Sequence, residues 1–233
     1  QVVSIPYVDK DLNLFQGSVV VELATTTQGA KIRYTLDGSE PTEESFLYKH
    51  PFSLNKTTQV KARGFKEGYH PSRVLSIIAL KAELKDALSV HPVQNGVTYK
   101  YFEGNYQKVT AIEKTPLLRT GVLSKPSIQG ASRTDHFGYI FSGLIKVPEN
   151  GVYTFQTSSD DGSVLYIDNE LVVNNDGSHA AIPATGFIAL EKGFHSYKLY
   201  YFEDYEGEHL SWAWKLPSAE TLVPIPSSVL YVE

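Results

Sequence analysis

Apolar and polar residues alternate through most of the chain, and no long stretch repeats with the 3.6-residue period of a helix. In the first third of the chain, this period of two predicts short strands that turn-rich pieces such as Asp37-Gly38-Ser39 separate. The predicted strands are Ser18–Ala24, Lys31–Leu36, Gln59–Phe65 and Arg73–Leu80. Short strands at this spacing indicate a small β-sandwich.

The rest of the chain is longer and more aromatic, and it also has a period of two. Its predicted strands are Val97–Phe102, His136–Val147, Val152–Thr157, Ser163–Ile167, Phe187–Leu190, His195–Phe202 and Leu210–Lys215. Asp168-Asn169 is expected to turn the chain tightly between Leu165–Ile167 and Leu171–Val173, because both residue types tolerate a left-handed backbone. About nine or ten strands indicate a second, larger β-sandwich.

Between the two halves, Lys81–Gln94 lacks strand alternation and is charged at its start. We interpret it as a connection with one helical turn, which ends at His91-Pro92 because the residue before proline prefers an extended backbone. The sequence therefore predicts an all-β protein of two β-sandwich domains. They comprise residues 1–84 and 95–233, joined by residues 85–94.

Composition excludes several classes of protein. The 233 residues carry a formal net charge of −5, whereas nucleic-acid-binding proteins usually present a basic face. No apolar run approaches the roughly 18 residues that a membrane-spanning helix needs. The chain has no cysteine, which excludes disulfides and thiolate chemistry. It has no methionine, so we expect a processed product or a segment of a longer protein.

Adjacent carboxylates mark the most suggestive loop. The net charge is +1 over residues 1–84 and −6 over residues 85–233, so the acidity belongs to the second half. There, Asp160 and Asp161 follow the predicted strand Val152–Thr157 after two serines. Two neighbouring Asp side chains can supply part of the oxygen ligand set of Ca²⁺. The alternative is an Asp-Gly turn in which both side chains accept hydrogen bonds from backbone amides, and the pattern alone favours that turn.

Two further polar loops and one aromatic strand are candidates for ligand contact. The loop residues are Asn174, Asn175, Asp176, Asp204, Tyr205 and Glu206, with His179 as a weaker candidate. Each loop alone is more typical of a solvated surface than of a site. Trp212 and Trp214 face one side of a strand, where they form either a platform for a sugar ring or part of the core. Zinc-helix, nucleophile-elbow and phosphate-loop motifs are absent, so we do not expect an enzyme.

The first half resembles the chitobiase/β-hexosaminidase C-terminal-type module. The resemblance is carried by Gly29–Thr42, which contains Tyr-Thr-Leu-Asp-Gly-Ser-Glu-Pro-Thr, and by Gln59–Phe65 and Gly68–Ser72. That family implies an immunoglobulin- or fibronectin-like sandwich attached to bacterial glycosidases, without catalytic residues.

The second half resembles the protective-antigen-type domain of toxins, glycosidases and flocculins. The matching segments are Gly96–Gly104, His136–Pro148, Gly151–Phe155 and Ser158–Asp168. In the sugar-binding members an Asp-Asp pair, often joined by a cis peptide, holds Ca²⁺, and sugar hydroxyls complete the coordination. Carried over, Asp160 and Asp161 are metal ligands. The second binding loop of the family, which normally supplies an Asn, falls at Glu203–Glu208 and offers Asp204 as a further ligand.

Together the resemblances imply a non-catalytic, carbohydrate-binding accessory region of a secreted, periplasmic or cell-surface bacterial glycoside hydrolase. The expected partners are terminal sugars of glycans, bound through Ca²⁺, and a covalently attached catalytic domain such as a β-hexosaminidase or α-fucosidase. Asn174, Asn175, Asp176, Asp204, Tyr205, Glu206 and Trp212 would shape the ligand site. The alternative from another class is a structural spacer or protein-contact module that positions the catalytic domain without binding sugar.

Overall fold

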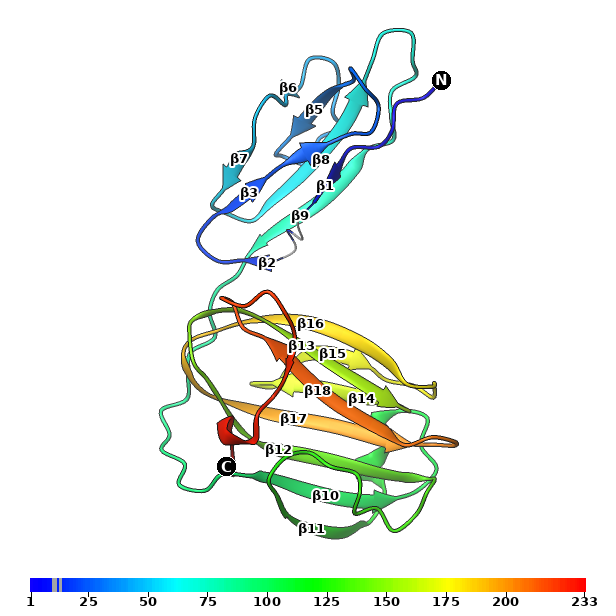
Figure 1. The fold of residues 1–233 in the computed structure, drawn as a ribbon, viewed down its shortest axis with the longest axis vertical. Helices are drawn as coiled ribbons and strands as arrows, with labels where there is room; N and C mark the ends of the chain where they lie inside the picture. The colour runs from blue at the N-terminus through cyan, green and yellow to red at the C-terminus, as the bar shows by residue number, and fades with distance from the viewer. Residues whose placement is uncertain (10–11, 13) are drawn as a thin grey trace. The chain divides into compact units, whose positions relative to one another are not determined.

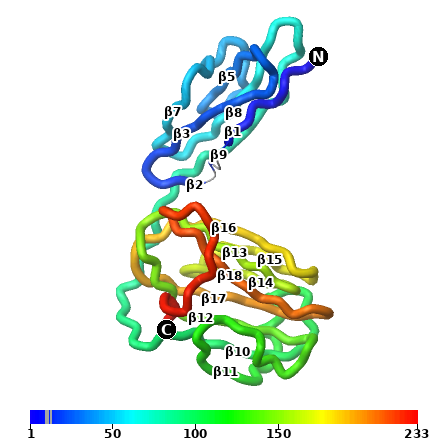
Figure 2. Tube along the Cα trace, in the orientation of Figure 1, coloured from blue at the N-terminus to red at the C-terminus, as the bar shows by residue number. Residues whose placement is uncertain are grey.

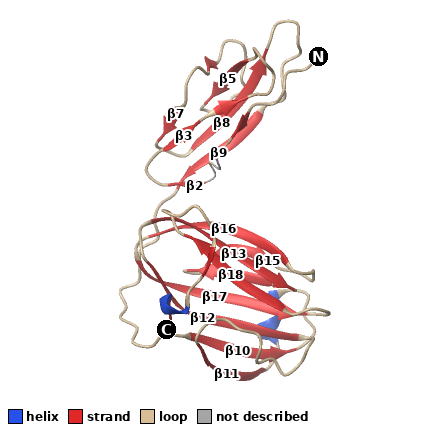
Figure 3. Ribbon diagram, in the orientation of Figure 1, coloured by secondary structure: helices blue, strands red, loops and turns tan. Residues whose placement is uncertain are grey.

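The computed structural model describes residues 1–9, 12 and 14–233, which form two compact units, Gln1–Glu83 and Leu84–Glu233 (Figure 1). Strands dominate the regular structure of both units (Figure 3): 50% of the chain is strand and 4% is helix. The predicted all-β class is therefore confirmed. In the described part of the chain, no helix combines the length and apolarity that a membrane crossing requires.

The first unit is a small β-sandwich. Its strands are β1 (Tyr7–Val8), β2 (Leu14–Phe15), β3 (Val19–Val21), β4 (Leu23–Ala24), β5 (Lys31–Thr35), β6 (Phe46–Leu47), β7 (Phe52–Leu54), β8 (Thr58–Phe65) and β9 (Leu75–Lys81). One sheet has the order β2-β9-β8-β5-β6, and the short pairs β3-β7 and β1-β4 complete the sandwich. Alternate residues of β8, among them Val60 and Ala62, are fully buried in the core between these layers.

Prediction of the first unit succeeded for its longer strands. The predicted Lys31–Leu36 contains β5, Gln59–Phe65 and Arg73–Leu80 each cover all but one terminal residue of β8 and β9, and Ser18–Ala24 divides into β3 and β4. Strands of two or three residues such as β1, β2, β6 and β7 are too short to show a period, so the sequence pattern does not reveal them.

The second unit contains eleven described strands and two short 3₁₀ helices. They are β10 (Val97–Glu103), η1 (Val109–Lys114), β11 (Leu117–Leu123), β12 (Phe137–Val147), β13 (Gly151–Asp160), β14 (Ser163–Ile167), β15 (Glu170–Asn175), β16 (Ile182–Leu190), β17 (Gly193–Glu203), β18 (His209–Lys215), β19 (Val223–Pro224), η2 (Ser227–Val229) and β20 (Leu230–Tyr231). The trace in Figure 2 follows them in chain order.

Two antiparallel sheets pack together in this unit. The larger sheet has the order β11-β10-β12-β17-β14-β15, with β20 also paired to β12, and the smaller has the order β16-β13-β18-β19. Large aromatic side chains fill the space between them, with Tyr139, Phe141, Tyr153, Phe155 and Tyr201 at 1% exposure or less. The predicted larger sandwich is therefore present.

The larger sheet is covered on its other face as well. Ile140 of β12 and Phe202 of β17 pack there against Ile112 of η1. A methyl group on Gly138 would lie 3.2 Å from the Ile112 side chain, so the helix sits directly on the sheet. This cover explains why almost every residue of β12 is buried and why its alternation is weak.

Asp168 and Asn169 form the predicted tight turn between β14 and β15. Their φ angles are 47° and 62°, and Ile167 is the direct cross-strand partner of Glu170. A two-residue loop with positive φ at both positions matches the twist of the flanking strands. The segment after β9 contains no helical turn: Lys85 and Leu88 instead form isolated bridges with Leu190 and Phe194 of the second unit.

Candidate functional site

The Asp160–Asp161 pair lies where β13 ends. β13 runs between β16 and β18, so Asp160 stands at the end of a central strand of the smaller sheet, and the peptide bond to Asp161 is cis. Asp160 is half-buried, whereas Asp161 is 3% exposed. Directly before the pair, the buried Ser159 hydroxyl lies 2.8 Å from that of Ser163, which donates to Thr157 Oγ1 at 3.0 Å. These bonds fix the corner between β13 and β14.

Asp161 holds two loops with its carboxylate. Its Oδ1 accepts the backbone N–H of His179 at 2.8 Å, and its Oδ2 accepts those of Asp204 at 2.7 Å and Tyr205 at 3.2 Å. Asp160 makes a lighter contact, since its Oδ2 accepts the backbone N–H of Ala181 at 3.1 Å. The pair therefore joins the segments after β15 and after β17 to the end of β13.

Glu203, the last residue of β17, is a member of the site that the sequence reasoning missed. Its carboxylate is fully buried, and one oxygen each of Asp160, Asp161 and Glu203 lie within 4.8 Å of one another. Oε1 of Glu203 has no hydrogen-bond partner among the described residues. Burial, with the nearby charges of Asp161 and Asp160, raises the pKa of Glu203 to about 8.

The period-two pattern of β17 contains the signal for Glu203. Tyr197, Leu199 and Tyr201 point into the core, and the next residue in that alternation is Glu203. The sequence interpretation placed the end of the strand at Phe202 and assigned Glu203 to the acidic loop Glu203–Glu208, in which it named Asp204 and not Glu203 as a ligand.

Tyr201 connects Glu203 to the Asp pair. Its hydroxyl lies 2.6 Å from the carbonyl oxygen of Asp160 and 2.9 Å from Oε2 of Glu203. One hydroxyl carries one hydrogen, so it can donate to only one of these acceptors, and a protonated Glu203 supplies the second hydrogen bond. The raised pKa of Glu203 fits this arrangement, and burial raises the pKa of the Tyr201 phenol as well.

Asn174 and Asn175, which the sequence predicts in a polar loop, are instead the last two residues of β15, and only Asp176 begins the loop after it. Asn175 is 6% exposed and donates through Nδ2 to Ser159 Oγ at 3.1 Å and to the carbonyl of Ile182 at 3.0 Å. Asp176 Oδ1 accepts the backbone N–H of Val109, the first residue of η1, at 2.9 Å. Asn174 is exposed. Asn175 and Asp176 thus fix the end of β15 and the start of the following loop, and Asn174 is exposed on the strand.

In the loop after β17, Asp204 lies outside the carboxylate cluster. Its Oδ2 accepts the Ser178 hydroxyl at 2.8 Å, and its Oδ1 is 3.7 Å from Nδ1 of His136. Tyr205 is 65% exposed, and Glu206 is exposed with a left-handed φ of 62°. This loop therefore presents an aromatic ring and a carboxylate to solvent beside the Asp pair.

Trp212 lies in the core. It is 8% exposed, and its ring centroid is 5.1 Å from that of Tyr197 on β17. Trp214 is 3% exposed and packs against Tyr153 and Phe155. Trp212 and Trp214 lie on the inner side of β18, and Ala213 between them points to the other side. Trp212 therefore offers no open face for a sugar ring.

Three clustered carboxylates can together hold a hard cation. Ca²⁺ takes oxygen ligands in flexible geometry, and Asp160, Asp161 and Glu203 supply one each within the measured spread. The buried Oε1 of Glu203 has no hydrogen-bond partner, and such an acceptor lowers the stability of the fold by about 1–3 kcal/mol. A cation bound to this oxygen would remove that cost, so the three residues fit a cation site.

Two family models match the chain. Residues 13–76 match the Chitobiase/beta-hexosaminidase C-terminal domain, and residues 93–227 match the PA14 domain, which covers more than half of the chain. Neither is a catalytic domain. Both resemblances drawn from the sequence are thereby confirmed.

One curated relative matches most of the chain. A Beta-hexosaminidase of Porphyromonas gingivalis (strain ATCC BAA-308 / W83) is 26% identical over 222 residues, which is 89% of this chain and 28% of the relative. The chain therefore spans less than a third of that relative's length.

Two solved PA14 structures share the fold of the second unit. The PA14 domain of the MpAFP antifreeze protein has a TM-score of 0.52 and 14% identity, over 64% of this chain and 96% of that one. The PA14 sugar-binding domain from an RTX adhesin has a TM-score of 0.51 and 15% identity, over 60% of this chain and 100% of that one.

Proposed function

The chain belongs to the PA14 domain family, and from that membership we propose that its second unit binds terminal sugars of glycans as a non-catalytic accessory region of a glycoside hydrolase. The similarity to a beta-hexosaminidase supports the link to a glycosidase. A PA14 structure described as a sugar-binding domain supports the ligand class. In this proposal the protein is secreted, periplasmic or on the cell surface, where glycans are found, and a catalytic domain is covalently attached.

Ca²⁺ is the proposed cofactor, held by Asp160, Asp161 and Glu203. The single observation that carries this assignment is the buried Oε1 of Glu203, which lacks a partner and belongs to the cluster within 4.8 Å. When bound, Ca²⁺ supplies open coordination positions that sugar hydroxyls can fill. Asp204 stays a proposed further ligand. Its backbone N–H donates to Asp161, which keeps the loop that carries Asp204 next to the Asp pair.

The chain's own residues orient the sugar. Asp161 fixes both loops around the cluster through its three backbone hydrogen bonds. The exposed ring of Tyr205 is the proposed stacking surface. Exposed Asn174 and Glu206 offer hydrogen-bonding groups at the rim. Binding of one sugar unit is weak because it buries little area, and attachment to the enzyme compensates by raising the effective concentration.

One observation favours the spacer function as a second candidate. Both carboxylate oxygens of Asp161 accept hydrogen bonds from backbone N–H groups of the chain itself. Hydrogen bonds to a charged acceptor contribute about 1.5–3 kcal/mol each, so these bonds can hold both loops. In this second candidate the acidic pair is a structural corner, and both units position a catalytic domain.

Calcium titration with a thermal melting readout tests the proposal. Ca²⁺ that binds only the folded chain raises its stability by RT ln(1 + [L]/Kd). We expect such a rise in the wild type and its loss in Asp160→Asn and in Glu203→Gln. Glu208→Gln is the matched control, because Glu208 is exposed in the same loop and outside the cluster.

A glycan array with and without EDTA completes the test. Calcium-dependent binding of terminal sugars, lost in Asp160→Asn, supports the lectin function. A melting curve that neither Ca²⁺ nor Asp160→Asn changes, together with an empty array, overturns it and leaves the spacer function.

A further inference from the structure

The outer face of the β5–β8 pair in the first unit is basic. Lys31 and Arg33 on β5 alternate with the buried Ile32, and Lys61 and Arg63 on β8 alternate with buried residues such as Ala62. The even positions point into the core, so these four cationic side chains share the outer face. Lys61 forms an ion pair with Glu40 at 2.6 Å, so the positive charge of this face rests on Lys31, Arg33 and Arg63.

Two of these cations stand directly opposite each other. Arg33 and Arg63 are cross-strand Cα partners, an arrangement that is destabilising for like charges. Each guanidinium uses one N–H on a backbone carbonyl, Arg33 on Ser45 at 2.9 Å and Arg63 on Ser72 at 2.8 Å. Among the described residues, neither arginine has a carboxylate within ion-pair distance, so their charge is not neutralised by the chain.

A hollow of about 670 Å³ opens beside the basic face, within the range of roughly 300–1,000 Å³ typical of small-ligand pockets. Its lining includes three cations, Lys31, Arg33 and Lys66, and two carboxylates, Glu43 and Glu67. Phe65 and Tyr69 supply aromatic rings. Charged groups combined with aromatic rings match the two aspects of a sugar, its polar hydroxyls and its apolar ring face.

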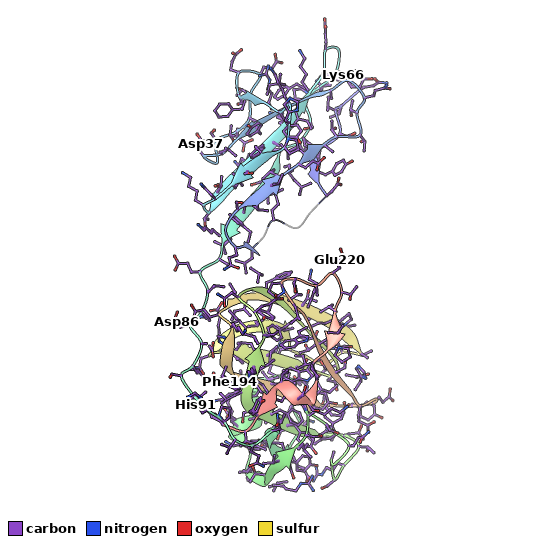
Figure 4. All side chains as sticks on the ribbon, turned by 60° about the vertical axis from the view of Figure 1, so that its left-hand side comes forward. Asp37, Lys66, Asp86, His91, Phe194 and Glu220 are labelled. Atoms are coloured by element: carbon purple, nitrogen blue, oxygen red, sulfur yellow. The ribbon has the colours of Figure 1, made fainter. Side chains whose placement is uncertain are left out.

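The aromatic wall is held in place by cations. Lys66, which follows β8 directly and is labelled in Figure 4, has its ammonium 4.6 Å from the centroid of the Tyr69 ring and donates to the carbonyl of Gln28 at 2.9 Å. The guanidinium of Arg63 lies 5.8 Å from the centroid of the Phe65 ring. Lys31 is the direct cross-strand partner of Phe65, so a cation and a ring lie side by side in the lining of the hollow.

We propose that this hollow in the first unit is a second saccharide site, specific for a sugar unit that carries one anionic group. Lys31 and Arg33 face the carboxylate or sulfate, and Phe65 and Tyr69 face the ring. The carboxylates of Glu43 and Glu67 accept sugar hydroxyls and disfavour a dense polyanion. This site lies outside the PA14 match and uses no metal, so it is independent of the calcium site proposed above.

An NMR titration of the whole 233-residue chain tests the site. The probes are N-acetyllactosamine 6′-sulfate and unsulfated N-acetyllactosamine, both added in the presence of EDTA. We expect the sulfated sugar to shift the backbone amide signals of Lys31, Phe65, Lys66 and Tyr69 at millimolar concentration. The neutral sugar should bind with a Kd at least tenfold higher. Added NaCl should raise the Kd of the sulfated sugar, because salt screens the attraction between exposed charges.

A pair of charge reversals supplies the matched control. Lys31→Glu should raise the Kd of the sulfated sugar at least tenfold. Lys56→Glu changes the net charge equally, but Lys56 is exposed in the turn between β7 and β8 and does not line the hollow. The Kd of the sulfated sugar for this variant should therefore stay within about twofold of the wild-type value. Asp160→Asn should have no effect, which separates this site from the calcium site.

Three results would overturn the inference. They are equal shifts with both sugars, an equal loss of affinity in Lys31→Glu and Lys56→Glu, and the absence of shifts around the hollow. Melting curves of both variants show that the fold is kept, and Arg33→Gln repeats the test at a second lining residue if Lys31→Glu unfolds the unit.

Discussion

Nδ1 of His195 lies 2.6 Å from Oδ2 of Asp168, and the imidazole is fully buried. The other ring nitrogen, Nε2, lies 2.8 Å from the carbonyl oxygen of Glu191. Both neighbours are acceptors, and only the doubly protonated imidazole has two N–H donors. His195 therefore carries a positive charge that Asp168 balances. Asp168 also accepts the backbone N–H of Ser196 at 2.8 Å, so the pair ties the β14–β15 turn to β17.

Removal of the negative partner should destabilise the second unit. Asp168→Asn keeps a residue that tolerates the left-handed backbone but leaves a buried positive charge without its counterion. We expect a loss of about 3 kcal/mol in the free energy of unfolding, measured by chemical denaturation. Glu170→Gln is the control on the same hairpin, because its 2.7 Å ion pair with Lys85 is exposed and should be worth less than about 1 kcal/mol. Equal losses in the two variants would contradict this account.

The same pair predicts a pH dependence of stability. Burial lowers the pKa of His195, but its bonds to Asp168 and Glu191 outweigh burial and raise that pKa above the usual 6.5. Burial raises the pKa of Asp168, but its bonds to His195 and Ser196 hold that pKa below the usual 3.8. Because the pKa of His195 is higher in the folded state, protonated His195 stabilises the fold fully below pH 6.5. This stabilisation is lost as the pH rises through the pKa of His195 in the folded state. Because the pKa of Asp168 is lower in the folded state, ionised Asp168 stabilises the fold above pH 3.8. This stabilisation is lost as the pH falls through the pKa of Asp168 in the folded state.

Denaturation at a series of pH values measures this contribution. The difference in unfolding free energy between the wild type and Asp168→Asn should be largest between pH 3.8 and pH 6.5 and should shrink at alkaline pH. A difference that grows with pH above 7 would rule out the charged imidazole.

Gly186 of β16 should tolerate no side chain. A methyl group there would lie 1.6 Å from the carbonyl oxygen of Val172 on β15, at the place where the edges of the two sheets meet. Backbone atoms cannot rotate away, so we expect Gly186→Ala to cost about 3 kcal/mol or more by overpacking. Gly130→Ala is the control, because its nearest contact would be 3.7 Å away. A thermal melt that is unchanged in Gly186→Ala would contradict this packing.

Asp161 should order both loops of the site without a cation. Asp161→Ala leaves the backbone N–H groups of His179, Asp204 and Tyr205 without their acceptor. We expect faster hydrogen exchange of these amides in EDTA and a loss of about 3 kcal/mol in stability. Asp160→Ala removes one such bond and should have the smaller effect. If the two variants exchange alike, Asp161 does not hold the loops.

Local pattern was sufficient to predict the long strands. β8 and β17 alternate buried and exposed or half-buried residues over much of their length, so their period is visible without knowledge of the fold. β11 escaped prediction because it lies at the edge of its sheet and five of its seven residues are exposed, so no buried face imposes alternation. The 3₁₀ helix η1 was missed because only Val109 and Ile112 in it are buried.

The candidate site shows the same division. Asp160 and Asp161 are neighbours in the chain, and a family resemblance was enough to single them out. Glu203 is 42 residues further along. It joins the pair only because β17 ends beside the corner between β13 and β14, where Tyr201 is the cross-strand partner of Ser163.

The amino-acid sequence by itself determined the all-β class, the two family resemblances, the β14–β15 turn and the acidic pair, because each depends on residues close together along the chain. Only the tertiary structure decided that Glu203 is buried beside Asp160, that Trp212 is a core residue, and that Arg33 faces Arg63. The physical reason is that burial and charge proximity depend on which strands pair and which faces pack, and these contacts join residues far apart in the sequence.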